Sequence, residues 1–290
     1  MSFSLTPRLL HVPSPMTSTT RRTAYRLSAL VAVLMAVTAG LGLFSHDVYR
    51  DNALVAAGWY GNDLVTLVVA TPLLTVALAG AWRGSHRATL VWLGLLAYTV
   101  YNYAFYLFGA AFNSLFLLYT ALFTLSGAAL IFGLASLDVR RLHAQVSDAL
   151  PTGRIVAFLT LVGGSLGGFY VIQSLQYLET GDVPAPMDAT GLHTHLIAAL
   201  DLSLVVPVAL LGAVWLWRDE PWGYVLAVVW SVKGTIYMMA LIAATLSGLW
   251  MGASGAWELL PVWGAIGVGC GAASRVLLSH LGPGRTTRRA

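Results

Sequence analysis

Long apolar runs separated by short polar segments fill almost the whole chain. Eight of these runs are long enough to cross a bilayer as helices, which takes about 20 residues each. We predict them at residues 24–44, 62–82, 88–109, 115–135, 155–175, 195–217, 224–249 and 261–281. The pattern therefore predicts an all-α integral membrane protein, built as a bundle of eight transmembrane helices.

Composition excludes a water-soluble domain. Of the 290 residues, 58% are hydrophobic and only 10% are charged, whereas soluble domains carry about 25% charged residues. The single cysteine, Cys270, excludes an intrachain disulfide and a metal site built from several cysteines. The basic residues flank apolar runs, so the net charge of +4 concerns orientation in a lipid bilayer and indicates no nucleic acid partner.

The chain divides into three parts. Residues 1–20 are rich in Ser, Thr and Pro, and we expect them to form a disordered cytoplasmic segment. Residues 21–282 hold the eight-helix transmembrane domain, and residues 283–290 form a basic cytoplasmic tail. A signal peptide is the alternative for the first apolar run, but the run is long and no Ala-x-Ala site follows it. Met16 is an alternative start to Met1.

The basic residues predict how the helices are oriented. Of the sixteen, Lys233 lies within a span and Arg50 on one side of the membrane, which leaves fourteen on the other side. These are Arg8, Arg21, Arg22, Arg26, Arg83, Arg87, Arg140, Arg141, Arg154, Arg218, Arg275, Arg285, Arg288 and Arg289. The positive-inside rule makes their side cytoplasmic. We therefore predict a multi-pass protein of the cell membrane with both termini in the cytoplasm.

Two of the predicted spans resemble each other. Residues 63–83 read DLVTLVVATPLLTVALAGAWR and residues 201–218 read DLSLVVPVALLGAVWLWR, although the match needs a three-residue offset. A duplication would give two parallel halves of four helices, an architecture known among transporters. It would place Asp63 and Asp201 at related positions around a cleft that opens outward. The alternative is that apolar spans resemble one another by composition alone.

Two charged residues lie inside apolar spans and mark a candidate site. A charge at the centre of a bilayer costs roughly 2.5–3.5 kcal/mol on insertion scales and usually faces a bundle interior or a water cavity. With a helical rise of about 1.5 Å per residue, Asn102 and Tyr170 fall near the depth of Asp201 in the membrane. Lys233 lies about 10 Å farther in. The predicted substrate or proton pathway consists of Asp201, Lys233, Asn102, Asp63 and Tyr170. A buried network that only fixes helix packing is the alternative.

His193 and His195 are weak candidates for a metal site. Residues two apart point to nearly opposite faces of a helix, so both can bind one ion only on an extended segment. No HExxH motif accompanies them, and we predict neither a metal nor a cofactor. A lysine in a late span, with an aspartate one helix earlier, also matches a retinal Schiff base and its counter-ion. No further motif supports that interpretation, which needs seven helices and not eight.

These features favour a transporter-like protein with an outward-facing polar cavity for a small solute or a proton relay. One alternative is an intramembrane enzyme at the outer leaflet, assisted by a metal at the two histidines. The other is a non-catalytic membrane component whose charges are structural. The expected partners are the lipid bilayer and a small solute. No Walker loop, Gly-x-Ser-x-Gly motif or dinucleotide-binding glycine pattern indicates a specific reaction.

Overall fold

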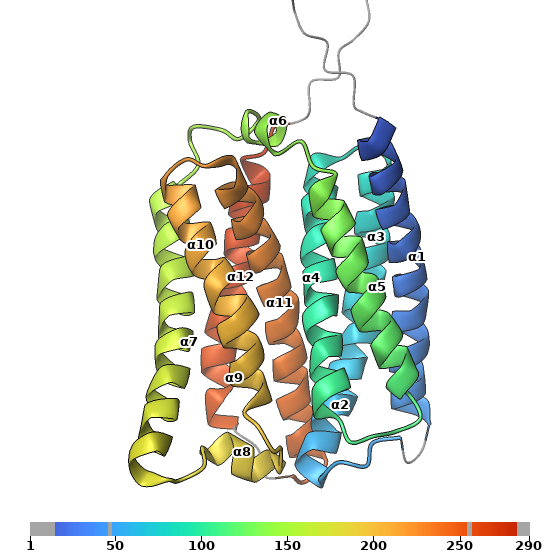
Figure 1. Ribbon diagram of the computed structural model, residues 1–290, viewed down its shortest axis with the longest axis vertical. Helices are drawn as coiled ribbons and strands as arrows, with labels where there is room; N and C mark the ends of the chain where they lie inside the picture. The colour runs from blue at the N-terminus through green and yellow to red at the C-terminus, as the bar shows by residue number, and fades with distance from the viewer. Residues whose placement is uncertain (1–14, 46–47, 254–256, 283–290) are drawn as a thin grey trace, which may run out of the picture.

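The protein is a bundle of helices that stand roughly parallel to one another (Figure 1). The computed structural model describes residues 15–45, 48–253 and 257–282. Over these residues the chain is helical apart from turns, loops and isolated bridge pairing between Val146 and Leu281. Eight of the helical segments that it describes are long and apolar enough to cross a membrane. The prediction of a multi-pass, all-α membrane protein is therefore confirmed.

The short helices α6 (Val139–His143) and α8 (Ala185–Thr190) lie at opposite ends of the bundle, which we call the α6 end and the α8 end (Figure 1). The spans themselves are, in chain order, α1 (Pro15–Phe44), α2 (Ala53–Val65) with η1 (Thr66–Ala70) and α3 (Thr71–Trp82), α4 (His86–Gly109), α5 (Phe116–Ala135), α7 (Thr152–Thr180), α9 (Leu196–Leu200) with η2 (Asp201–Val205) and α10 (Val206–Trp217), α11 (Pro221–Trp250), and η3 (Trp257–Leu259) with α12 (Leu260–Ser279).

Most span boundaries lie within a few residues of those predicted, and two differ more. The second span begins at Ala53, nine residues before the predicted start, because the Asn52 side chain caps the helix by accepting from the Val55 amide. Helix α1 begins at Pro15, within the segment 1–20 that we expected to be disordered. Residues 1–14 and the basic tail 283–290 lie outside the described residues.

Two spans contain a wider, π-type segment directly before a proline. In η2 the backbone bonds reach five residues back, so the Val206 amide donates to the Asp201 carbonyl. Pro207 follows, and in a regular helix its ring would collide with the carbonyl four residues earlier. The wider turn absorbs this collision. The same arrangement precedes Pro72, where η1 joins α2 to α3.

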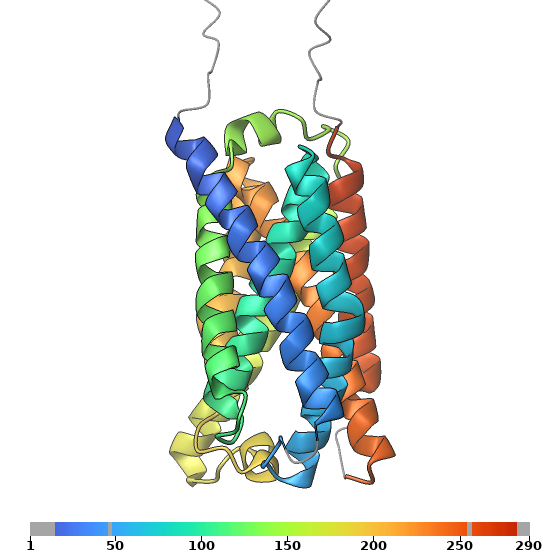
Figure 2. The same ribbon diagram turned by 90° about the vertical axis from the view of Figure 1, so that its right-hand side faces the viewer.

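The two widened spans agree in register, but the two halves of the bundle pack differently. Segments η1 and η2 each have 5 residues, and α3 and α10 each have 12. In this register the counterpart of Asp201 is Thr66, and Asp63 lies three residues earlier. Helix α1 crosses obliquely along α5 (Figure 2), whereas α7 makes few contacts with α12. The duplication of four helices therefore stays a prediction.

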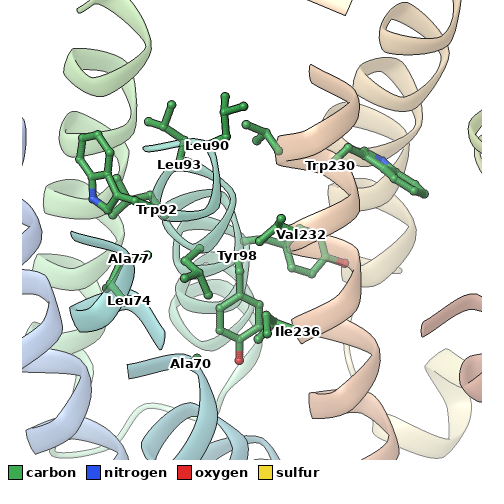
Figure 3. Close-up of a cluster of buried hydrophobic side chains, with 14 of the residues drawn as sticks. Ala70, Leu74, Ala77, Leu90, Trp92, Leu93, Tyr98, Trp230, Val232 and Ile236 are labelled. Atoms are coloured by element: carbon green, nitrogen blue, oxygen red, sulfur yellow. The ribbon is translucent and has the colours of Figure 1, made fainter. Parts of the chain in front are cut away.

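Helices α4 and α11 hold the centre of the bundle. Figure 3 shows Tyr98 of α4 between Leu74 of α3 on one side and Val232 and Ile236 of α11 on the other. Gly94 allows this close packing, because a Cβ atom there would lie 2.6 Å from the Val232 Cβ. Lipid tails are as apolar as leucine, so helices in a bilayer associate through such close contacts. The site described below lies between these two helices and α2.

Exposed tryptophans mark both ends of the apolar zone. Trp82 and Trp217, near the α6 end, expose 70% and 69% of their surface, and Trp250, near the α8 end, exposes 88%. Such large apolar side chains would be unfavourable in bulk water, but tryptophan settles at the interface between lipid and water. Their positions agree with helices that cross a membrane from one end of the bundle to the other.

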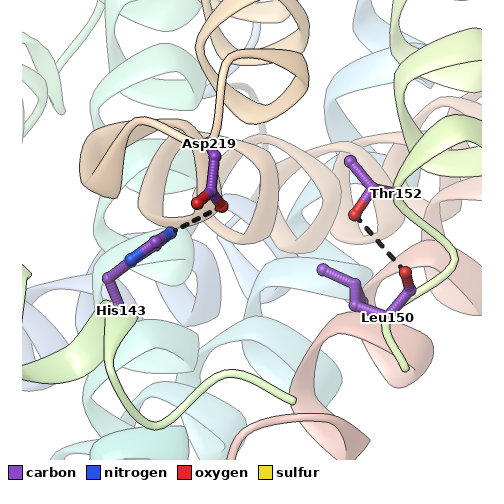
Figure 4. A network of polar contacts seen from close by, with 4 residues as sticks. All are labelled: His143, Leu150, Thr152 and Asp219. Carbon is purple, nitrogen blue, oxygen red and sulfur yellow. Dashed lines mark hydrogen bonds and ion pairs between the residues drawn. The ribbon is translucent and has the colours of Figure 1, made fainter. Parts of the chain in front are cut away.

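Polar contacts tie the loops together at the α6 end. His143 of α6 pairs with Asp219 in the turn between α10 and α11, with Nε2 and Oδ1 3.2 Å apart (Figure 4). Asp219 adopts a φ of 57°, in the left-handed region. The Gly282 amide donates to the Gln145 carbonyl at 2.9 Å, which fastens the end of the last helix to the loop after α6. An exposed ion pair contributes at most about 1 kcal/mol, so the backbone bond matters at least as much.

Candidate functional site

Asp201 is buried between three helices and accepts hydrogen bonds from two tyrosines. The Tyr101 hydroxyl of α4 donates to Oδ1 at 2.8 Å, and the Tyr170 hydroxyl of α7 donates to Oδ2 at 3.0 Å. Asp201 is also the first residue of η2, so the helix is widened where the carboxylate projects. The predicted pair of Asp201 and Tyr170 is thus in direct contact. Tyr101 was not predicted as a site residue.

Lys233 lies inside the bundle, and its ammonium group rests on the faces of aromatic rings. Nζ lies 3.6 Å from the centre of the Tyr101 ring and 4.4 Å from that of Tyr237. This is favourable cation–π geometry. Among the described residues, no carboxylate lies within 4.0 Å of Nζ. Tyr101 therefore connects the two charges, since it donates to Asp201 through its hydroxyl and holds the lysine on its ring.

Asn102 belongs to a different polar group. Its Oδ1 accepts from the Asn62 amide nitrogen of α2 at 2.8 Å, and the Asn62 Oδ1 lies 3.5 Å from the Tyr98 hydroxyl. The Asn102 Nδ2 is buried and has no hydrogen-bond partner. An unsatisfied buried amide costs about 1–3 kcal/mol. Asn102 thus makes its hydrogen bond with Asn62 and not with Asp201 or Tyr170, the residues predicted near its depth.

Asp63 forms a separate cluster toward the α8 end. It accepts from the Tyr106 hydroxyl of α4 at 2.8 Å and from the Tyr49 hydroxyl of the loop before α2. Burial, followed by the charge of Asp63, raises the pKa of the Tyr49 phenol, which therefore stays protonated as the donor. Asp63 shares no hydrogen-bond partner with Asp201 among the described residues. Neither aspartate lies in the wall of the cavity described below.

A cavity of about 180 Å³ lies between α2, α4 and α11, just inside the α8 end of the bundle. Its wall is mostly apolar. The lining residues are Leu54, Val55, Gly58, Trp59, Asn62, Asn102, Phe105, Gly109, Met187, Thr190, Leu192, Thr194, His195, Leu196, Ile197, Tyr237, Ala240, Leu241 and Ala244. Of the residues predicted for the substrate or proton pathway, only Asn102 is among them, and the metal candidate His195 is also present. The expectation of a polar cavity is therefore met at a few positions and not along the whole wall.

The polar lining residues from the three central helices gather at the inner end of the cavity. Helix α2 enters from the α8 end, so Asn62 is its innermost lining residue. Helices α4 and α11 run the other way, which makes Asn102 and Tyr237 their innermost lining residues. The cavity thus has apolar sides and a floor with two carboxamides and one phenol.

Helix α8 and the segment after it cover the mouth of the cavity. Met187 and Thr190 of α8 line the cavity, and the Asn52 amide donates to the Thr190 carbonyl at 3.0 Å and to that of Ala189 at 3.2 Å. Asn52 therefore caps α2 and holds the cover in place with the same side chain. The sequence pattern could not predict these hydrogen bonds, because they join residues more than a hundred positions apart.

His195 is a capping residue of α9. Its Nδ1 accepts from the Ala198 amide at 3.3 Å, so Nε2 carries the hydrogen and donates to the Gln173 Oε1 at 3.2 Å. Burial holds the pKa of His195 below its usual range, against the opposing charge of Asp201. His193 is exposed. Within the part of the chain that the structure describes, no three His, Cys, Asp or Glu side chains converge as metal ligands.

The tyrosines are the functional candidates that the charge pattern missed. Four of them stand on α4 in the stretch YTVYNYAFY, residues 98–106. Three of their hydroxyls contact different neighbours, and that of Tyr103 has no partner among the described residues. So dense a run of phenols within a span is a usable signal, because a buried hydroxyl needs a partner. No known protein family, no curated protein and no solved structure matches this chain.

Proposed function

We propose that this multi-pass membrane protein is transporter-like, admitting a small solute at the α8 end and handling a proton beneath it. One observation carries the proposal. Tyr237 lines the cavity, its hydroxyl oxygen lies 3.4 Å from that of Tyr101, and Tyr101 donates to Asp201. A chain of hydroxyl groups therefore runs from the floor of the cavity to a buried carboxylate.

Such a chain can move a proton without free charge in lipid. Each hydroxyl accepts a proton on its oxygen and releases its own, so a proton from cavity water would pass through Tyr237 and Tyr101 to Asp201. The 3.4 Å step is longer than a good O–H···O bond, which spans about 2.5–3.0 Å. A bridging water or a small rotation of the Tyr237 ring closes it. Lys233 on the Tyr101 ring favours the ionised carboxylate that receives the proton.

Proton flux tests the proposal directly. The purified protein is reconstituted into liposomes that contain a pH-sensitive dye, and a potassium diffusion potential drives protons inward. We expect acidification that Asp201→Asn abolishes and that Asp63→Asn retains, since Asp63 lies outside the chain of hydroxyls. Flux no greater than that of empty liposomes, or equal flux in both variants, would reject the relay.

Orientation is part of the proposal. The arginines that lie at the α6 end, Arg83, Arg140 and Arg218 among them, support a cytoplasmic location for that end in a cell membrane and a cavity that opens outward. Single cysteines in a Cys270→Ser background report this. We expect cysteines at Ser85 and Ser147 to react only from the cytoplasm, and one at Thr180 only from outside. Labelling of Ser147 from outside intact cells would invert the arrangement.

A non-catalytic membrane component is the second candidate, and one observation favours it. Both oxygens of each buried aspartate already accept a hydrogen bond from a tyrosine, as in a network that only fixes packing. Under this alternative, both Asp→Asn variants lose stability and neither changes proton flux. The reconstitution experiment therefore separates the two candidates. The outer-leaflet enzyme has no such support, because both ring nitrogens of His195 are already engaged.

A further inference from the structure

We propose that the cavity binds a neutral, mostly apolar molecule that presents one hydrogen-bond acceptor to Asn102. The inference names a solute class for the cavity and rests on the proposed function only for the direction of entry. It starts from a buried group in the cavity wall that has no hydrogen-bond partner among the described residues. Asn102 is only 2% exposed, it lines the cavity, and its Nδ2 has no partner.

The neighbours of Asn102 fix the orientation of its carboxamide. Its Oδ1 is occupied by the Asn62 amide, and the Asn62 Oδ1 lies in turn near the Tyr98 hydroxyl, which contacts the Thr66 hydroxyl at 3.2 Å. This sequence of hydrogen bonds orients the Asn102 carboxamide, leaving two N–H groups as donors. A donor pair with no protein acceptor selects a carbonyl, ether or similar oxygen on the ligand.

Charge selects a neutral molecule. None of the described lining residues is Asp, Glu, Lys or Arg, and His195 is held in its neutral form by the amide that it caps. A carboxylate or an ammonium ion would lose its hydration without gaining a counter-charge, which is strongly unfavourable in an apolar site. The ammonium of Lys233 lies 4.4 Å from the centre of the Tyr237 ring, and Lys233 is not among the lining residues.

Volume selects a small ring or a short chain. The cavity measures about 180 Å³, and an engineered apolar cavity of about 150 Å³ binds benzene. A ligand of roughly six to ten non-hydrogen atoms therefore fills it. Trp59, Phe105 and Leu241 provide aromatic and aliphatic walls for the body of such a molecule, with its acceptor directed at the floor.

A matched pair of probes tests this class. Acetophenone and α-methylstyrene have the same shape and the same number of non-hydrogen atoms, and they differ by a carbonyl oxygen in place of a methylene group. Radiolabelled probes are equilibrated with the protein in lipid nanodiscs, and uptake by empty nanodiscs is subtracted. One neutral hydrogen bond predicts that acetophenone binds about two- to tenfold more tightly than the hydrocarbon.

Variants locate the effect. Asn102→Leu keeps the size of the side chain and removes the donors, so the preference for acetophenone should disappear while α-methylstyrene still binds. Ala244→Phe fills the cavity and should abolish saturable binding of both probes. Ala265→Phe, on the exposed face of α12, is the matched control and should change neither. If Asn102→Leu fails to assemble, two measurements still test the ligand class. They are the relative affinity of the two probes for the unaltered protein and the loss of binding in Ala244→Phe.

The outcomes separate this inference from the proposed function. Equal affinity for the two probes, a preference that persists in Asn102→Leu, or no saturable binding at all would overturn the ligand class. A ketone preference without proton flux in liposomes leaves the binding site in place and removes the relay. Proton flux without a preference for acetophenone leaves the relay in place and removes the proposed binding site.

Discussion

Asp63 and Asp201 show the same local chemistry in two different surroundings. Each is a buried carboxylate in a span that contains a π-type segment, and each accepts hydrogen bonds from two tyrosine hydroxyls. In both cases one donor stands on α4. The two carboxylates thus have the same immediate ligands, and any difference in role must come from what lies behind the tyrosines.

Behind the tyrosines, the two sites differ in charge and in access. Around Asp63 the donors belong to an aromatic cluster in which the Tyr106 ring stacks on Trp59 at 4.3 Å, and no described cation contacts these rings. Behind Asp201, Tyr101 carries the Lys233 ammonium on its ring and meets Tyr237 of the cavity wall. The comparison shows that one carboxylate is enclosed, whereas the other is connected to a charge and to a cavity.

The largest effect should follow from removing the connected carboxylate. Asp201→Ala leaves the Lys233 ammonium buried without a counter-charge and two tyrosine hydroxyls without an acceptor. Losing one partner of a buried charged pair costs about 3–5 kcal/mol. Lys233→Met removes the charge at similar volume and should cost less. The free energy of unfolding in detergent, measured for both single variants and the double variant, checks this.

The double variant makes the test sharp. If the two charges stabilise each other through Tyr101, Lys233→Met should recover part of the stability that Asp201→Ala loses. Simple additivity of the two losses would mean that Tyr101 does not couple them.

Removing the enclosed carboxylate should cost less. Asp63→Ala leaves no cation unpaired, and the Tyr106 hydroxyl can turn to the Trp59 carbonyl 3.3 Å away. We expect a loss of about 1–3 kcal/mol, because the Tyr49 hydroxyl loses its acceptor and an orphaned buried hydroxyl costs about that much. Thermal unfolding of the same preparations measures it. A loss as large as that of Asp201→Ala would show that the lysine adds nothing to the difference between the sites.

The start of the second span shows why the sequence placed one of these sites imperfectly. Asn62 and Asp63 are adjacent polar residues and were interpreted as the edge of an apolar run, so the span was predicted from residue 62. In the fold they are buried nine residues inside a helix that begins at Ala53. Hydropathy measures polarity along the chain and cannot distinguish an exposed polar residue from one whose partners come from other helices.

The rest of the site depends on such partners. The burial of Lys233 and Asp201 could be predicted from the cost of charge in lipid, and it is confirmed. The roles of Tyr101 and Asn62 could not be, because they depend on how α4 is rotated against α2 and α11. That rotation is set by contacts such as Gly94 against Val232, which no single span contains.

A smaller effect tests how tightly the Asp63 site is enclosed. A Cβ atom on Gly42 of α1 would collide with the Asp63 carboxylate and the Tyr49 hydroxyl, whereas one on Gly40 meets nothing within 4 Å. Gly42→Ala should therefore lose about 1–3 kcal/mol through overpacking. Gly40→Ala, in the same helix, should be neutral or slightly stabilising. Equal effects of the two substitutions on the unfolding midpoint would contradict the enclosure.

The smallest effect concerns pH at the mouth of the cavity above Asp201. Burial lowers the pKa of His195 from its ordinary value of 6.5, so the unfolded chain takes up a proton at a higher pH than the folded protein does. Stability should therefore be constant above that value, fall as the pH decreases through it, and level off below the folded pKa. Protonation also removes the Nδ1 lone pair that caps the Ala198 amide.

His195→Asn retains a capping oxygen and cannot titrate. As the pH falls through 6.5, it should lose less stability than the unaltered protein. Because the Asp201 charge opposes the shift, Asp201→Asn should widen the pH dependence of a protein that keeps His195. Parallel pH profiles for the His195→Asn variant and the unaltered protein would show that folding leaves the pKa of His195 unchanged.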